Sequence, residues 1–386
     1  MGTIKVPLEP KALRWAMARA RLSPELLARS LRVKPEKVEA WLVGKEKPSY
    51  RQARLLAQRL HIPFSQLLVS PPDHVDLPVP DLRRGRARGV EPSPELLEAI
   101  YSALRKRDWY REHHPGNGCP VVGTVSLQRS TPAEVAESIG RWIPIQILQK
   151  QCSTWSEFLR KFVEKTEELG ILVLRQSYVG SNTRRKYNPN EFSGFAIADR
   201  IAPVIFLNTR DFIARQVFTL AHELAHIWLA TSALDAGLES LDPPLEKVER
   251  FCDSVAAELL MPEIRFLQVW KKGESFEAAQ HVAKEFKVSA WAALRRAREL
   301  GLIGRKEYVE TLKRVQEAIQ AREERERREG GDFWNTLKAR NSPSFTMAVV
   351  KAAARGEISA KEVASLLDLN LRTALDFLER VAYVSP

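Results

Sequence analysis

Two histidines four residues apart, His222 and His226, lie in the segment DFIARQVFTLAHELAHIWLA, which spans residues 211–230 and has apolar residues at helical spacing. Helix positions four apart share one face, about one turn from each other, so both imidazoles can meet one metal ion. Glu223 is turned by about 100° from His222, close enough to reach a metal-bound water without being a ligand. The segment predicts a metal-binding helix in which Glu223 is the general base. A pair of hydrogen-bonded core histidines is the alternative.

A second helical segment, residues 246–260, supplies the carboxylates that such a site needs. Glu249 and Asp253 are four residues apart and therefore share a face. Catalytic zinc sites commonly use three protein ligands, and two histidines with one glutamate are an established set, so we expect Glu249 to be the third ligand. We expect Asp253 to accept a hydrogen bond from the free ring nitrogen of one histidine and so to orient it. Glu246 and Glu258 are lesser candidates.

These residue types predict hydrolysis of a peptide bond. A zinc ion held by them would polarise a carbonyl group and acidify a water molecule, and Glu223 would accept the proton of that water. Manganese is a possible replacement for zinc. No oxyanion donor can be assigned, although Tyr178, Tyr187 and the strand expected at 204–207 are plausible neighbours, and that strand could hold a substrate as an added strand.

The segments FTLAHELAHIWL and ERFCDSVAAELLMP, the latter from Glu249 to Pro262, resemble the ImmA/IrrE family of metallopeptidases. Where that family commonly has alanine and asparagine, this chain has Cys252 and Asp253; the aspartate is similar to a thermolysin-like Glu-x-x-x-Asp arrangement. The resemblance includes residues 77–83 and extends less specifically over most of the chain. It implies a regulatory protease that cleaves a transcriptional repressor of a DNA-damage response or a mobile element, using zinc or manganese.

The N-terminal seventy residues hold most of the basic excess, with 14 Lys and Arg against 5 Glu, a net charge of +9 out of +12 for the whole chain. A helix from Ser23, a tight turn at 32–33 and a helix from Pro35 to Leu42 have the proportions of a DNA-binding helix-turn-helix. Over residues 8–68 the pattern resembles the phage-repressor (XRE) type, with a small helical docking module as the alternative. The core would include Val33, Val38 and Trp41, and the candidate contacts to double-stranded DNA are Lys34, Lys37, Lys45, Lys47 and Ser49.

The fold class that we expect is mainly α with a small β-sheet: an all-helical helix-turn-helix domain, an α+β zincin-like peptidase domain and a helical C-terminal region. The sheet should comprise strands at 171–174, 195–197 and 204–207, the last two joined by a hairpin turn at 199–203. The expected domains are 1–70 for the helix-turn-helix, 71–94 for a Pro- and Arg-rich linker, 95–270 for the peptidase domain, 271–304 for a helix-turn-helix-like segment and 305–386 for the C-terminal region.

The sequence lacks an apolar signal segment and a run of apolar residues long enough to span a membrane, which predicts a cytoplasmic protein without a membrane partner. Its three cysteines, Cys119, Cys152 and Cys252, are far apart and show no CxxC spacing, so we expect buried thiols.

Three functional hypotheses follow. The first is a site-specific metallopeptidase that acts on a regulator, with self-cleavage near residues 83–88 as a further possibility. The second is a DNA-binding regulator whose peptidase-like domain senses a metal or ligand without turnover, although sensing would not need Glu223. The third is one half of a toxin-antitoxin or phage-immunity module, in which the peptidase domain chiefly binds a partner protein.

Overall fold

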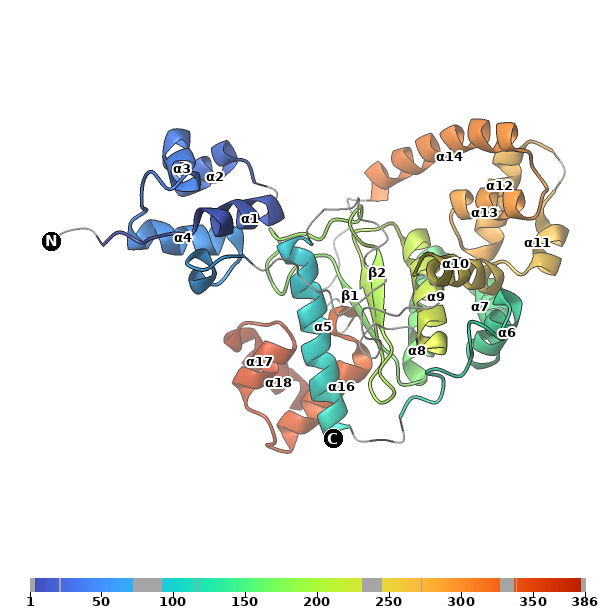
Figure 1. Ribbon diagram of the computed structural model, residues 1–386. Coiled ribbons are helices and arrows are strands. Elements are labelled where there is room, and N and C mark those ends of the chain that lie inside the picture. The colour runs from blue at the N-terminus through green and yellow to red at the C-terminus, as the bar shows by residue number, and fades with distance from the viewer. Residues whose placement is uncertain are drawn as a thin grey trace. The chain divides into compact units, whose positions relative to one another are not determined.

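The computed structural model describes residues 4–20, 22–71, 92–114, 116, 118–230, 245–271, 273–326, 337 and 339–382. These residues are mainly helical, with one three-stranded sheet (Figure 1), which confirms the predicted fold class. The chain divides into two compact units, and the division falls within α5 (Pro94–His113). Most of the predicted linker, residues 72–91, lies outside the described residues, as does the suggested self-cleavage segment.

The N-terminal unit is a small helical bundle. Its α2 and α3 begin at prolines and are joined by a turn in which Arg32 adopts a left-handed conformation with φ of 55°. Val38 and Trp41 of α3 are buried in the bundle core, and Val33 packs partly buried against it, as predicted. The elements are α1 (Pro10–Ala20), α2 (Pro24–Leu31), α3 (Pro35–Leu42), α4 (Tyr50–Leu60) and the 3-10 helix η1 (Phe64–Leu67).

The sheet of the larger unit has the order β1-β3-β2. Its strands are β1 (Leu172–Gln176), β2 (Gly194–Ile197) and β3 (Val204–Asn208). The central strand β3 is buried along its whole length, pairs parallel with β1 and pairs antiparallel with β2. Asp199 accepts hydrogen bonds from the amides of Ile201 and Ala202, which closes the predicted turn between β2 and β3.

The helices of the described residues that accompany this sheet are α6 (Pro132–Trp142), α7 (Ile145–Gln151), α8 (Trp155–Glu168), α9 (Ile213–Leu229), α10 (Leu245–Leu260), α11 (Glu263–Val269), α12 (Ser275–Phe286), α13 (Ala290–Glu299) and α14 (Arg305–Glu326). Among the described residues, one hydrophobic core runs from Cys119 through α9 and α10 to Val315 of α14. The segment 271–304 does form two helices joined by a short turn, and both pack into this core.

The C-terminal helices α16 (Pro343–Ala354), α17 (Ala360–Leu366) and α18 (Leu371–Ala382) complete the larger unit. A buried ion pair joins them to α5, since Lys106 Nζ lies 2.5 Å from Asp368 Oδ2 and Lys106 is only 2% exposed. Burial lowers the pKa of Lys106, while the negative charge of Asp368 raises it and so opposes this shift. Across the described residues, no helix is long and apolar enough to cross a membrane.

A methyl group added at Gly194 should destabilise the protein. The new Cβ would lie 2.7 Å from the Phe206 carbonyl oxygen and 2.6 Å from Thr219 Cγ2, which forces β2 away from β3 and α9. We expect Gly194→Ala to lower the free energy of unfolding by about 1–3 kcal/mol, as other overpacked cores do. Gly140→Ala in α6 is the matched control: it meets no atom within 4 Å and should leave stability equal or higher. Urea denaturation measures both, and equal shifts would contradict the steric argument.

Candidate metal centre

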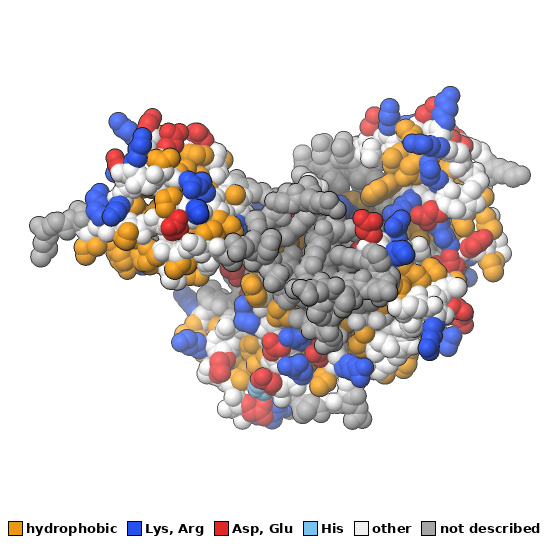
Figure 2. Space-filling model, in the orientation of Figure 1, with side chains coloured by type: hydrophobic (Ala, Val, Ile, Leu, Met, Phe, Trp, Pro, Cys, Tyr) orange, Lys and Arg blue, Asp and Glu red, His pale blue; other side chains and the backbone are white. Residues whose placement is uncertain are grey.

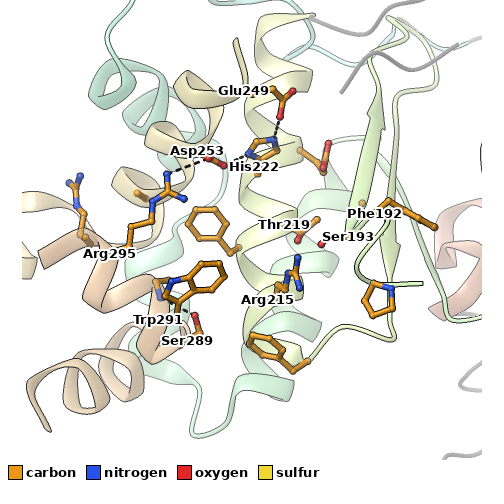
Figure 3. Close-up of a pocket in the computed structure, with 18 of the residues that line it drawn as sticks. Phe192, Ser193, Arg215, Thr219, His222, Glu249, Asp253, Ser289, Trp291 and Arg295 are labelled. Carbon is orange, nitrogen blue, oxygen red and sulfur yellow. Dashed lines mark hydrogen bonds and ion pairs between the residues drawn. The ribbon is translucent and has the colours of Figure 1, made fainter. Parts of the chain in front are cut away.

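The two histidines of α9 face a carboxylate of α10, the helix with which α9 makes its most extensive contact. His222 Nε2 lies 3.4 Å from Glu249 Oε2, and His226 Nε2 lies 3.3 Å from Glu249 Oε1. The two Nε2 atoms are 3.1 Å apart. His226 and Glu249 are buried, and the side chain of His222 is 12% exposed. The structure thus brings together all three residues that the sequence indicated as ligands. Figure 3 shows two of them, His222 and Glu249, facing each other.

These separations fit the geometry of a zinc site. Donor atoms about 2.0–2.1 Å from a tetrahedral ion are about 3.3–3.4 Å from one another. The observed spacings of 3.1, 3.3 and 3.4 Å are close to that value, although the two histidines approach different oxygens of the Glu249 carboxylate. Two imidazole nitrogens and one carboxylate are also a donor set that zinc accepts. A small movement of the two imidazole rings would therefore allow all three residues to bind one ion.

Glu223 lies beside these donors, between α9 and β2. It is 3% exposed and lines the same cavity as His222 and Glu249. The backbone of Gly194 passes close to it, because a Cβ built on that glycine would lie 3.4 Å from Glu223 Oε1. This distance is an ordinary van der Waals contact, so β2 packs directly against the Glu223 carboxylate.

Asp253 contacts His222, one of the two histidines between which the sequence left the choice open. Its Oδ1 lies 3.0 Å from His222 Nδ1, so an Nδ1–H donated to Asp253 leaves the Nε2 lone pair directed toward the other donors. Arg295 of α13 contacts the other oxygen of the same carboxylate, because its Nη2 lies 3.4 Å from Asp253 Oδ2 (Figure 3). The sequence analysis missed Arg295, since local spacing pairs it only with Glu299 of its own helix.

The electrostatics of this cluster favour opposite charges on its members. Burial opposes protonation of His222, but hydrogen bonds to Asp253 and Glu249 and the charge of Glu223 raise its pKa well above the usual value. Burial also opposes ionisation of Glu249, yet hydrogen bonds from His222 and His226 lower its pKa well below the usual value. The cluster therefore favours a proton on His222 and ionisation of Glu249.

A cavity of about 360 Å³ opens over these residues. Residues 189–194 line one side of it, α9 and the second half of α10 form its floor, and the first turns of α13 form the opposite side. In Figure 3, Phe192 and Ser193 lie across the cavity from Trp291 and Arg295. The segment 271–304 thus contributes a wall of the cavity, a role that its helix-turn-helix pattern did not predict.

Several predicted neighbours lie outside the site. Glu246 is exposed on α10, and Glu258 forms an ion pair with Arg296. Tyr187 is buried, with its hydroxyl 3.4 Å from Gln176 Oε1. The Tyr178 ring packs against the guanidinium of Arg340. None of these four predicted residues is among those that line the cavity, although Arg296, the partner of Glu258, is.

The prediction that the strand at 204–207 could receive an added strand is wrong. This strand is β3, and both of its edges are already hydrogen-bonded, to β1 and to β2. Among the described residues, the edge that remains open on the cavity side of the sheet belongs to β2. The sequence could not show this, because strand order depends on contacts between distant segments.

The predicted DNA contacts lie around α3 and the loop that follows it. Lys34, Lys45 and Lys47 are exposed, and Lys37 is partly exposed. Ser49 has a structural role, because its Oγ accepts a hydrogen bond from the amide of Gln52 at the start of α4.

Metal affinity should rise with pH. A proton on His222 competes with the metal, and the raised pKa of this histidine extends that competition to higher pH, so affinity is lost as pH falls through the raised pKa. Calorimetric titration with zinc in buffers of different ionisation enthalpy should show proton release near neutral pH. Asp253→Asn, which removes the charge that holds this proton, should shift the rise in affinity to lower pH. A pH-independent affinity would contradict the proposed proton competition.

Two comparisons with known proteins were informative in different ways, and the family comparison agrees with this geometry. No curated protein matches the chain. Residues 166–298, less than half of the chain, match a family model described as the IrrE N-terminal-like domain. The matched span contains the three donors, Glu223, Asp253 and the cavity wall from α13, and this match supports placing the region in the ImmA/IrrE peptidase family.

Proposed function

We propose that this chain is a zinc-dependent endopeptidase whose ligands are His222, His226 and Glu249 and whose general base is Glu223. The observation that carries the proposal is the set of three donor atoms at zinc-like spacing on the floor of a cavity that Glu223 also lines. The match of residues 166–298 to the IrrE N-terminal-like domain supports the same class. Manganese is the alternative metal.

The residues of the chain have separate tasks in this proposal. A bound metal ion would supply Lewis acidity, which polarises a carbonyl group and acidifies water. Glu223 accepts the proton of the attacking water and delivers it to the departing amine. Asp253 holds His222 in the tautomer that ligates through Nε2.

The substrate that we propose is a polypeptide bound in an extended form along β2. Within the part of the chain that the structure describes, this strand pairs on one side only, with β3, and the residues that lead into it line the cavity. An extended segment added to an open strand edge gains backbone hydrogen bonds without requiring a particular sequence. Such binding would bring a peptide bond over the metal donors and next to Glu223.

We further propose that the N-terminal unit binds double-stranded DNA and that the cleaved polypeptide is a transcriptional repressor or another regulator in a stress response or in mobile-element control. The α2-turn-α3 arrangement and the exposed lysines around α3 support DNA binding. In Figure 2, Lys and Arg side chains are spread over the visible face of this unit among apolar and acidic ones. The three buried free thiols are consistent with our proposal of a cytoplasmic location.

Glu223→Gln should retain the metal and lose cleavage. The amide keeps the shape of the side chain but cannot accept the proton, so we expect a loss of about 100-fold or more. The zinc-loaded protein is incubated with a proteome-derived peptide mixture and new termini are counted by mass spectrometry. Metal content, measured by elemental analysis, should be unchanged in Glu223→Gln and sharply reduced in Glu249→Ala. Zinc-loaded wild-type protein that cleaves no peptide and no repressor would favour the sensing alternative.

Replacing four lysines, Lys34, Lys37, Lys45 and Lys47, with alanine should weaken DNA binding and flatten its salt dependence. Each lost phosphate contact should reduce the slope of log affinity against log salt by about 0.9. Fluorescence anisotropy with a labelled duplex of random sequence measures this slope. The matched control replaces four exposed lysines of the larger unit, Lys150, Lys306, Lys351 and Lys361. Equal slopes for the two variants would contradict DNA binding through α3 and its loop.

A further inference from the structure

The cavity changes character with distance from the metal donors. Beyond His222 its walls become apolar: Ala257 of α10 and Met261, directly after that helix, form a buried floor, and Phe218 of α9 lies half-buried at one side. Trp291 of α13 closes the other side (Figure 3). These four residues, called the apolar subsite below, come from three helices that converge next to the site.

Trp291 is not needed to build the core. Helix α13 packs inward through a different face, formed by the fully buried Ala293, Leu294 and Ala297. The Trp291 side chain remains 42% exposed, although burial of a large aromatic side chain would stabilise the folded protein. A half-exposed tryptophan on a cavity wall is the kind of residue that contributes strongly to ligand binding.

The wall that carries Trp291 is fixed relative to the metal donors. One turn further along α13, Arg295 contacts Asp253, which in turn contacts His222. Ser289 caps the start of α13 by accepting a hydrogen bond of 3.0 Å from the amide of Ala292. The apolar subsite is therefore held at a constant distance from the donors, as a preorganised side-chain pocket requires.

The charged residues next to the subsite already form ion pairs. Arg295 contacts Asp253 and Glu299, and Arg215 contacts Asp211. An acidic substrate side chain would have to compete with the carboxylates of these pairs for the arginines, and a basic side chain would have to compete with the arginines for the carboxylates. The chemistry of the walls consequently favours an uncharged, apolar side chain.

We infer that Phe218, Ala257, Met261 and Trp291 form a specificity subsite that takes a large apolar side chain, such as that of leucine or phenylalanine, flanking the scissile bond of the polypeptide. This inference rests on the proposed peptidase function and narrows its substrate class. Trp291 is the residue that determines the preference, because it supplies the exposed aromatic surface that such a side chain covers.

The test uses three hydroxamates that are identical except for one side chain, which is hydrogen, isobutyl or benzyl. The hydroxamate group anchors each of them on the metal, so differences in affinity report the side-chain pocket. Calorimetric titration of the zinc-loaded full chain should show isobutyl and benzyl binding at least about tenfold tighter than hydrogen, as burial of one such side chain predicts. Trp291→Ala should cut this ratio at least about threefold and leave the affinity for the hydrogen compound unchanged.

The matched control is Trp142→Ala. Trp142 is similarly exposed, at 50%, but lies at the end of α6 outside the cavity, so its loss should leave the ratio unchanged. Trp291→Phe should keep most of the preference. A wild-type ratio near one, or a ratio that Trp291→Ala does not change, would overturn the subsite. If none of the three compounds binds the zinc-loaded protein, the peptidase proposal fails, and the subsite fails with it.

Discussion

The packing of α9 against α10 is the contact on which the rest of this structure depends. Helix α9 carries two of the three candidate metal donors, His222 and His226, and α10 carries the third, Glu249. Their close contact places His222, His226 and Glu249 within 3.4 Å of one another, at the spacing that one tetrahedral ion requires. The free energy for this arrangement comes from the apolar residues of both helices, which belong to the same hydrophobic core. Formation of the core therefore also positions the site, and any change that separates α9 from α10 separates the two histidines from Glu249.

The charges of the site are balanced by residues from three helices. Glu249 and Asp253 of α10 compensate His222 of α9, and Arg295 of α13 compensates Asp253 in turn. Buried charges are costly unless each has a partner, so this alternation permits a polar cluster beside an apolar core. The contact of Arg295 with Asp253 also links α13, which lines the cavity, to the ligand His222.

The proposed functions place two activities in one chain, because DNA binding and peptide cleavage use separate units. Linking them would concentrate the peptidase near regulators that occupy DNA, since a tethered site meets neighbouring molecules at high effective concentration. An apolar subsite fits such a role. Large apolar side chains are buried in folded proteins, so they reach the cavity only where a regulator exposes an extended segment. Selection for such a side chain would then protect folded proteins from cleavage.

The sequence by itself determined the helices, the fold class and the chemistry of the site. The four-residue spacings of His222 with His226 and of Glu249 with Asp253 specified faces, because helix geometry is local and repeats every 3.6 residues. Tertiary structure alone decided that Asp253 contacts His222, that β2 rather than β3 has the open edge, and that α13 walls the cavity with Trp291 and Arg295. These features depend on contacts between residues far apart in the chain. Spacing along a sequence carries no information about such contacts, whereas the packing of the core fixes them.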